Sequence, residues 1–88
     1  MAEEMETRIA LIGIIVEDRA YAEQANEILH EYRAYIVGRM GIPYQAKGVS
    51  IISIVVDAPE NIISAMSGKL GKLKGLHVKS MLAKGKKS

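Results

Sequence analysis

Two stretches of ten residues, RIALIGIIVE at 8–17 and GVSIISIVVD at 48–57, share the pattern that decides the fold. Both are rich in β-branched residues and are short for a helix, so each predicts a buried β-strand. Shifting the chain against itself by 40 residues pairs the two stretches position by position, from Ile9 with Val49 to Glu17 with Asp57. This internal repeat predicts that the chain is built from two similar halves.

Each strand pattern is followed by a helical pattern and then by a second, shorter strand pattern. Apolar residues recur at helical spacing in 22–32 and again in 59–71, and short strands are expected at 35–42 and 76–82. The order predicts an α+β, ferredoxin-like βαββαβ fold, in which a four-stranded antiparallel sheet carries two helices on one face. Right-handed crossovers would place the first and third strands in the centre, in the spatial order fourth, first, third, second.

The length and composition favour one small packed domain. The 88 residues predict a single domain at 8–82, with an N-terminal extension at 1–7 and a basic tail at 83–88. The 49% apolar content excludes disorder, and the absence of cysteine excludes disulfides and thiolate ligands. The longest apolar run, 9–16, has eight residues, whereas a membrane helix needs roughly 20. The N-terminus is acidic and lacks the basic start of a signal peptide. We therefore expect a cytoplasmic protein with no membrane contact.

The two central strand patterns carry apolar residues on both of their faces. Side chains alternate across a strand, and the even-numbered positions, apolar without a break, should pack under the helices. The odd-numbered positions are also largely apolar, although a solvated face should be polar. We expect this second face to be buried in a homo-oligomer, a dimer or a tetramer; the alternative is that one-residue bulges confuse the assignment of faces. The expected interface residues are Ile9, Leu11, Ile15, Val49, Ile51 and Val55.

The stretch VGRMGIPY at 37–44 is the most distinctive in the chain. Two glycines within a strand leave room for a close approach of another group. By simple alternation Arg39 falls on the open face of the sheet, and Met40 and Ile42 fall under the helices. An arginine on an apolar face is costly to bury unless it pairs with an anion.

A guanidinium is a planar fork suited to carboxylate or phosphate, so we expect Arg39 to anchor a small anionic metabolite at a subunit interface. The alternative is a bulged edge strand in which Arg39 pairs with Glu17 or Asp57 of a neighbouring subunit. Further residues could line the same cleft if neighbouring strands bring them together. The expected ligand-binding residues are Arg39, Gly38, Gly41, Tyr44, Gly13 and Ser53.

Nothing in the sequence predicts catalysis or a cofactor. The four serines within 50–67 lack the surroundings of a nucleophile elbow, and Asp18 is expected to cap the first helix. His30 and His77 should lie on opposite sides of the sheet, so one chain offers no metal site, although an intersubunit site at His77 stays open. The open face of the central strands lacks the aromatic residues on which an RNA-recognition motif stacks bases. We expect no enzyme, no cofactor, no metal and no direct nucleic-acid binding.

Four phrases, ALIGIIVEDR, YIVGRMGIPY, KGVSIISIVVDAP and ISAMSGKLGKLKGLHVKS, resemble the regulators of the iron-only hydrogenase system. The resemblance runs from about Arg8 to Lys79, and the phrase GRMGIPY is specific to that family. The family is similar in fold to ACT domains and to the C-terminal domain of the nickel-responsive repressor, which are ligand-sensing oligomers. The resemblance implies a part in regulating hydrogenase production or maturation.

The chain also departs from these wider relatives. It has no cysteine, no clustered histidine and no second domain, so metal sensing and DNA binding do not carry over from the nickel repressor. The loop at 17–19 lacks the glycine usual in ACT domains that bind amino acids. We expect a non-enzymatic, oligomeric regulatory module that senses a small ligand. The alternative is an adaptor that binds a partner protein through its sheet face or its basic tail.

Overall fold

The structure is a computed structural model that describes residues 6–84. Most of the expected N-terminal extension and basic tail, residues 1–5 and 85–88, lies outside the described residues. The main elements are β1 (Arg8–Val16), α1 (Ala22–Glu31), β2 (Ile36–Tyr44), β3 (Val49–Ala58), α2 (Glu60–Gly71) and β4 (Leu76–Leu82). Short 3-10 turns are η2 (Arg19–Tyr21), η3 (Arg33–Tyr35) and η4 (Gln45–Lys47).

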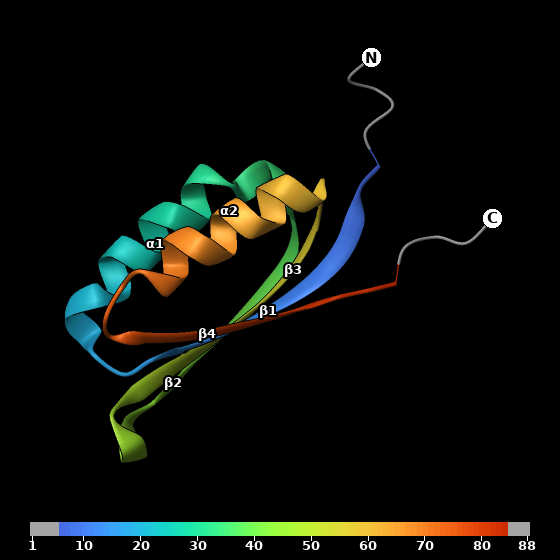
Figure 1. Ribbon diagram of the computed structural model, residues 1–88. Coiled ribbons are helices and arrows are strands. Elements are labelled where there is room, and N and C mark those ends of the chain that lie inside the picture. The colour runs from blue at the N-terminus through green and yellow to red at the C-terminus, as the bar shows by residue number, and fades with distance from the viewer. Residues whose placement is uncertain (1–5, 85–88) are drawn as a thin grey trace.

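The four strands form one antiparallel sheet, and both helices cover the same face of it (Figure 1). The strand order is β2-β3-β1-β4, which confirms the predicted order and the α+β, ferredoxin-like arrangement. β1 and β3 pair from Arg8 opposite Ala58 to Val16 opposite Ser50. The two repeated stretches are therefore the centre of the sheet.

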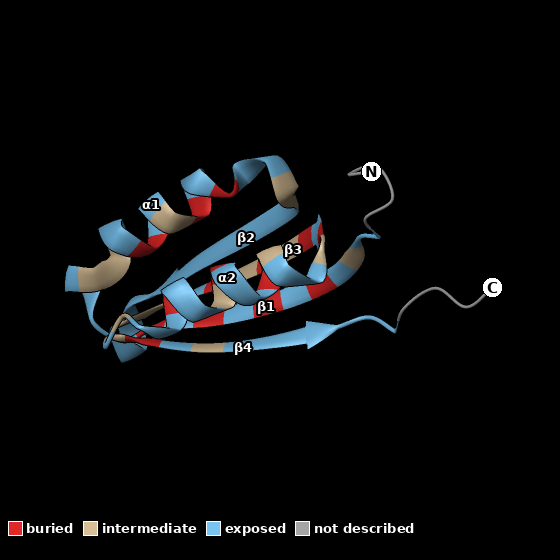
Figure 2. Cartoon of the chain, turned by 45° about the horizontal axis from the view of Figure 1, so that its top comes forward, coloured by how far each residue is buried: buried red, intermediate tan, exposed pale blue. Residues whose placement is uncertain are grey.

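The core is a single layer between the central strands and the helices, as the red residues in Figure 2 show. Ile12, Ile14 and Ile54 are at most 1% exposed, which confirms that the even-numbered face lies under the helices. The helical stripes pack on it through Ala25, Leu29, Ile63, Met66 and Leu70. Each fully buried aliphatic side chain contributes about 1.5–3 kcal/mol, so this layer is the main source of stability.

Polar contacts at the helix ends are few and exposed. The Asp18 Oδ1 accepts a hydrogen bond from the Ala20 N–H at 2.9 Å, so Asp18 is an N-cap, as expected, although it caps η2 rather than α1 itself. The Lys69 Nζ lies 2.8 Å from Glu31 Oε2 and joins the two helices. The hydrogen bond to Glu31 is the largest cause of the upward shift of the Lys69 pKa from its ordinary value.

β2 contains a bulge that sequence alternation does not reveal. Ile36 lies opposite Val56, but Gly38 lies opposite Val55, so Val37 is an extra residue on this strand. A bulge leaves one residue without a partner and shifts the register of everything that follows. The strand also continues through a proline, which an edge strand tolerates because its missing N–H is not needed by a second neighbour.

The bulge reverses the faces expected for the rest of β2. Arg39 lies opposite Ile54, on the face that the helices cover. Met40 and Ile42 lie on the open face, where they are 56% and 43% exposed. The expectations that Arg39 lies on the open face and that Met40 and Ile42 lie under the helices are both wrong, because a shift of one residue moves every later side chain across the sheet.

A close approach of backbone at Gly75 joins the start of β4 to the end of β1. The Glu17 N–H donates to the Gly75 carbonyl oxygen at 2.8 Å. A Cβ atom at Gly75 would lie 2.5 Å from the Asp18 Cβ and 2.7 Å from the Tyr21 Cδ2. Only glycine fits here without movement of its neighbours.

We predict that Gly75→Ala lowers the free energy of unfolding by about 2 kcal/mol, because the new methyl group must displace Asp18 or the Tyr21 ring. Urea denaturation followed by circular dichroism measures this change. The control, Gly68→Ala in α2, places a methyl group where nothing lies within 4 Å. It should raise the stability by up to about 1 kcal/mol, because alanine is the better helix former. Equal stabilities of the two variants would contradict the close approach.

Candidate functional site

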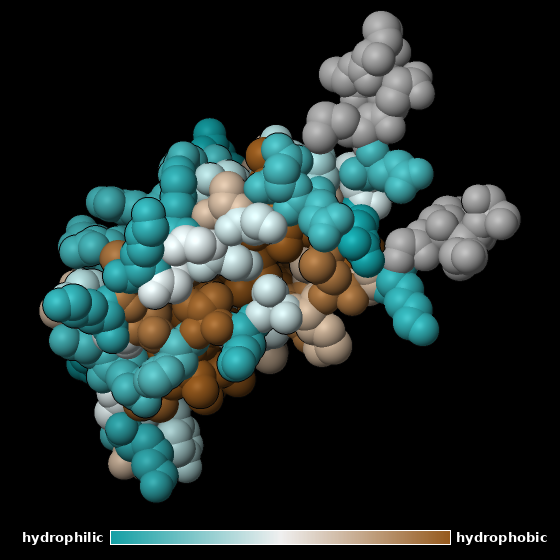
Figure 3. Space-filling model, viewed as in Figure 1, coloured by the Kyte–Doolittle hydropathy of each residue, from teal (hydrophilic) through white to brown (hydrophobic). Residues whose placement is uncertain are grey.

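The face of the sheet opposite the helices is apolar and open. Ile9, Leu11 and Ile15 of β1 are 42–46% exposed, which confirms the faces expected for the central strands. β2 adds apolar residues that alternation had placed elsewhere. Figure 3 shows apolar surface, in brown, gathered over the sheet below the helices. The exposed large apolar residues of this face are Ile9, Leu11, Ile15, Met40, Ile42, Tyr44, Ile51 and Met81.

The centre of this open face is hollowed. Gly13 of β1 lies between Ser53 of β3 and Lys79 of β4. These three residues line two adjoining hollows of about 390 and 340 Å³. The walls are bulkier, and are formed by Leu11 and Met81 on one side and by Ile15, Ile51 and His77 on the other.

Arg39 lies on the other side of the sheet, in a groove of about 260 Å³ between α1 and β2. Its Nη2 donates to the Asn26 Oδ1 of α1 at 3.1 Å. A guanidinium carries five N–H donors, so this bond leaves the rest of the fork for another acceptor. At Gly41, which lines the same groove, nothing lies within 4 Å of where a Cβ would stand, and the groove stays open there. The groove could accept a carboxylate or phosphate.

The six residues expected to bind ligand are divided between the two sides of the sheet. Arg39 and Gly41 line the groove under α1, whereas Gly13 and Ser53 line the hollows of the open face. Gly38 and Tyr44 also have their partners on the open face. One chain therefore does not gather these residues in a single cleft. The physical reason is the bulge, which separates Arg39 from the face where alternation places it.

The partners of Arg39 in the groove had no signal in the sequence. Asn26 is an ordinary exposed position of α1, and Ser50 is the second residue of β3. Spacing along the chain does not predict which helix residue lies beside which strand residue, because that depends on how α1 packs. The bulge at Val37 turns Arg39 toward α1, and the hydrophobic pattern of the strand does not mark it.

His77 lies on the open face, beside Ile15, as expected. Its Nε2 is 3.1 Å from the Oε1 of Glu17, the residue that follows β1, and both side chains are mostly exposed. Among residues 6–84 no group of three or more histidine, aspartate and glutamate side chains is placed to hold a metal ion. The pair lies within hydrogen-bond distance at the rim of the open face.

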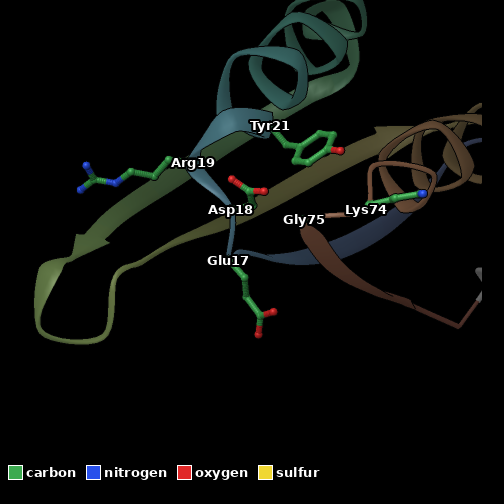
Figure 4. Close-up of a pocket in the computed structure, with 6 residues that line it drawn as sticks. All are labelled: Glu17, Asp18, Arg19, Tyr21, Lys74 and Gly75. Carbon is green, nitrogen blue, oxygen red and sulfur yellow. The ribbon is translucent and has the colours of Figure 1, made fainter.

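A wider cleft of about 740 Å³ lies where β1 ends and β4 begins (Figure 4). It is lined by Glu17, Asp18, Arg19, Tyr21, Lys74 and Gly75. Its charged side chains do not converge: Arg19 extends away from the other labelled residues, and Glu17 points away from Asp18. The Asp18 carboxylate already accepts the Ala20 N–H. The cleft mixes both signs of charge and offers no single point at which an anion would be held.

These features define the class of protein. It is a small α+β domain of ferredoxin-like arrangement, packed on one face of its sheet and apolar but open on the other. Within residues 6–84 no helix has both the length and the apolar character needed to cross a bilayer.

The chain belongs to the TM1266-like family, described as "Iron-only hydrogenase system regulator, putative", whose model matches residues 8–80. This confirms the resemblance seen in the sequence. The structure is similar to that of TM1266 from Thermotoga maritima, with a TM-score of 0.86 and 39% sequence identity. The similarity covers 90% of this chain and 100% of that one.

More distant likenesses concern the fold alone. A formyltetrahydrofolate deformylase from Pseudomonas putida KT2440 matches with a TM-score of 0.60 and 10% identity, over 83% of this chain and 28% of that chain. CPII from Thiomonas intermedia K12, a nitrogen regulatory PII-like protein, matches with a TM-score of 0.48 and 16% identity, over 90% of this chain and 96% of that one. We infer nothing about this chain from a TM-score this low. A comparison with curated proteins found no match.

Proposed function

We propose that this chain is a non-enzymatic regulatory module of the iron-only hydrogenase system that works as a homo-oligomer and binds a small anionic ligand. The observation that carries the proposal is the open face, where both central strands expose large apolar residues. Monomers rarely leave a contiguous apolar patch of this kind in water. The regulatory part rests on the family description. The non-enzymatic part rests on the sequence, whose serines lack the context of a nucleophile.

A second copy of the chain is the partner that fits this face best. The face is apolar along its centre, and its charges, on Glu17, His77, Lys79 and Asp57, lie toward its margins. Four strands about 4.8 Å apart and seven residues of about 3.3 Å each give a footprint of roughly 19 by 23 Å. Two copies would cover roughly 900 Å² of sheet, more once side-chain relief is counted, which reaches the roughly 1,000 Å² that a specific interface needs.

The ligand part of the proposal rests on Arg39. The Asn26 side-chain Oδ1 accepts a hydrogen bond from one edge of the guanidinium and thereby orients the planar fork in the groove. Ala22, Pro43 and the glycine at 41 give the groove short, mostly apolar walls, so an entering anion would find few competing acceptors. A small metabolite with a carboxylate or phosphate group suits this site.

The groove and the open face share one strand, which supports a regulatory coupling. Arg39 and Met40 are neighbours on β2 and point to opposite sides of the sheet. A ligand bound to Arg39 would therefore act on an edge strand whose other face belongs to the proposed interface. An adaptor that docks a different protein on the open face is the competing outcome, and it would leave the purified protein monomeric.

We predict that Leu11→Lys and Ile51→Lys each dissociate the oligomer or cause aggregation, because each places an unpaired charge in a buried interface. Sedimentation velocity at micromolar concentration measures the assembly. The matched control is Ser64→Lys, which adds the same charge at an exposed position of α2 and should leave the assembly unchanged. A monomeric wild-type protein, or unchanged assembly in both interface variants, would refute the oligomer.

We predict that inorganic phosphate raises the melting temperature of the wild-type protein above that in chloride of equal ionic strength, and that Arg39→Ala abolishes this increase. A site held at 100 times its dissociation constant gains about 2.7 kcal/mol, or at least roughly 10 °C for a domain of this size. Asn26→Asp should also abolish it, because the new carboxylate would neutralise Arg39. Native mass spectrometry of gently purified protein would then identify any retained metabolite.

The control for the anion site is Arg19→Ala, which removes a cation from the cleft at the end of β1 and should leave the phosphate effect intact. Loss of the effect in Arg19→Ala but not in Arg39→Ala would move the site to that cleft. If Arg39→Ala instead breaks the assembly and destabilises the protein without phosphate, Arg39 serves the structure rather than a ligand.

A further inference from the structure

The missing side chain at Gly13 is not explained by the chain itself. Among residues 6–84 only Gly48 has a positive φ, so the backbone at Gly13 suits any residue. A Cβ at Gly13 would meet nothing closer than the Lys79 carbonyl oxygen at 4.0 Å. Glycine inside a central strand is destabilising and commonly marks a site where another group approaches closely. A group that fills this space would therefore come from outside this chain.

The open face has two neighbouring rows of residues with opposite relief. We call Met40, Ser53, Gly13 and Lys79, which lie side by side across the four strands, the socket row. The next row, Ile42, Ile51, Ile15 and His77, we call the knob row. The socket row has small side chains at its two central positions, and all of its residues except Met40 line both hollows. The knob row has bulky side chains at its two central positions.

We propose that the socket row receives the knob row of a second copy of this chain, and that the exchange is reciprocal. This inference rests on the self-association proposed above and specifies its geometry. Consider a twofold axis that is parallel to the sheet, perpendicular to the strands and midway between the two rows. It sets Gly13 of each copy against Ile15 of the other. An axis along the strands would instead set hollow against hollow and leave a void, which well-packed interfaces avoid.

Charge supports the same pairing of rows. With the axis across the strands, β4 of one copy faces β4 of the other, so Lys79 lies opposite the second copy's His77. The Glu17 carboxylate is 3.1 Å from that histidine and therefore lies near the incoming ammonium group. Opposite charges that meet across an interface select its register. Pairing the socket row with the row on its other side would set Lys79 against Met81, which offers no charge.

The test of the socket is Gly13→Val, which fills it with a residue that suits a β-strand. Each copy carries the substitution, so the overpacking occurs twice, and the dissociation constant should rise at least ~30-fold. The matched control is Gly68→Val, at an exposed position of α2 where nothing lies within 4 Å of the new Cβ. Sedimentation velocity across a dilution series measures both variants, with thermal unfolding at a dilution where the wild type is monomeric.

A charge exchange tests the row pairing separately. Lys79→Glu should weaken the assembly, because it sets two carboxylates against each other, and the K79E/E17K double variant should restore it. High salt should reduce both effects, since the pair lies at an exposed rim. Failure of the double variant to restore assembly would overturn this register.

The outcomes separate the socket from the proposed function. An assembling wild type with an equally assembling Gly13→Val variant would overturn the socket alone. A Gly13→Val monomer less stable than the wild-type monomer would also overturn it, since Gly13 would then serve the chain's own fold. A wild-type protein that stays monomeric would overturn the self-association as well.

Discussion

The register between β1 and β3 is the constraint on which the rest of the structure depends. Ile12 lies opposite Ile54, and Gly13 opposite Ser53, in one unbroken antiparallel ladder. Because side chains alternate, this single register places the even-numbered residues of both strands under the helices and the odd-numbered ones on the open face. A slip of one residue between the strands would set core residues against open-face residues. The core, the apolar face and the hollow at its centre are therefore consequences of one pairing.

A domain of this size would gain stability from burial of the second face of its sheet. A chain of 88 residues buries only roughly 60% of its unfolded surface, and this chain has no disulfide to add stability. Its core is one layer of aliphatic side chains, without phenylalanine or tryptophan. In the proposed assembly, the open face would become a second apolar layer, and the stability of the domain would depend on protein concentration. A ligand that alters the assembly would then alter the stability and abundance of the folded form together.

The bulge in β2 gives the edge strand two different roles. Beyond Val37, its residues alternate between the helix-covered face and the open face, so the side chains of Arg39 and Met40 lie on opposite sides of the sheet. Edge strands are held by one neighbour only and shift more easily than central strands. In the proposed function, β2 would therefore be the element that couples a bound anion to self-association.

The sequence by itself determined the repeat, the α+β order of elements, the strand order and the core residues of the two central strands and the helices. It could do so because burial imposes a period of two on strands such as 8–17 and a helical period on 22–32, and both periods are visible along the chain. The family is also readable from local phrases such as GRMGIPY. Only the tertiary structure decided where Arg39 points and that Asn26 is its partner. A bulge costs one backbone pairing and leaves no mark in the hydrophobic pattern of an edge strand, and contacts between a helix and a strand depend on packing rather than on spacing. The hollow at Gly13 needed the sequence and the tertiary structure together. The glycine is visible in the sequence, but only the structure shows that a Cβ there would meet nothing closer than 4.0 Å.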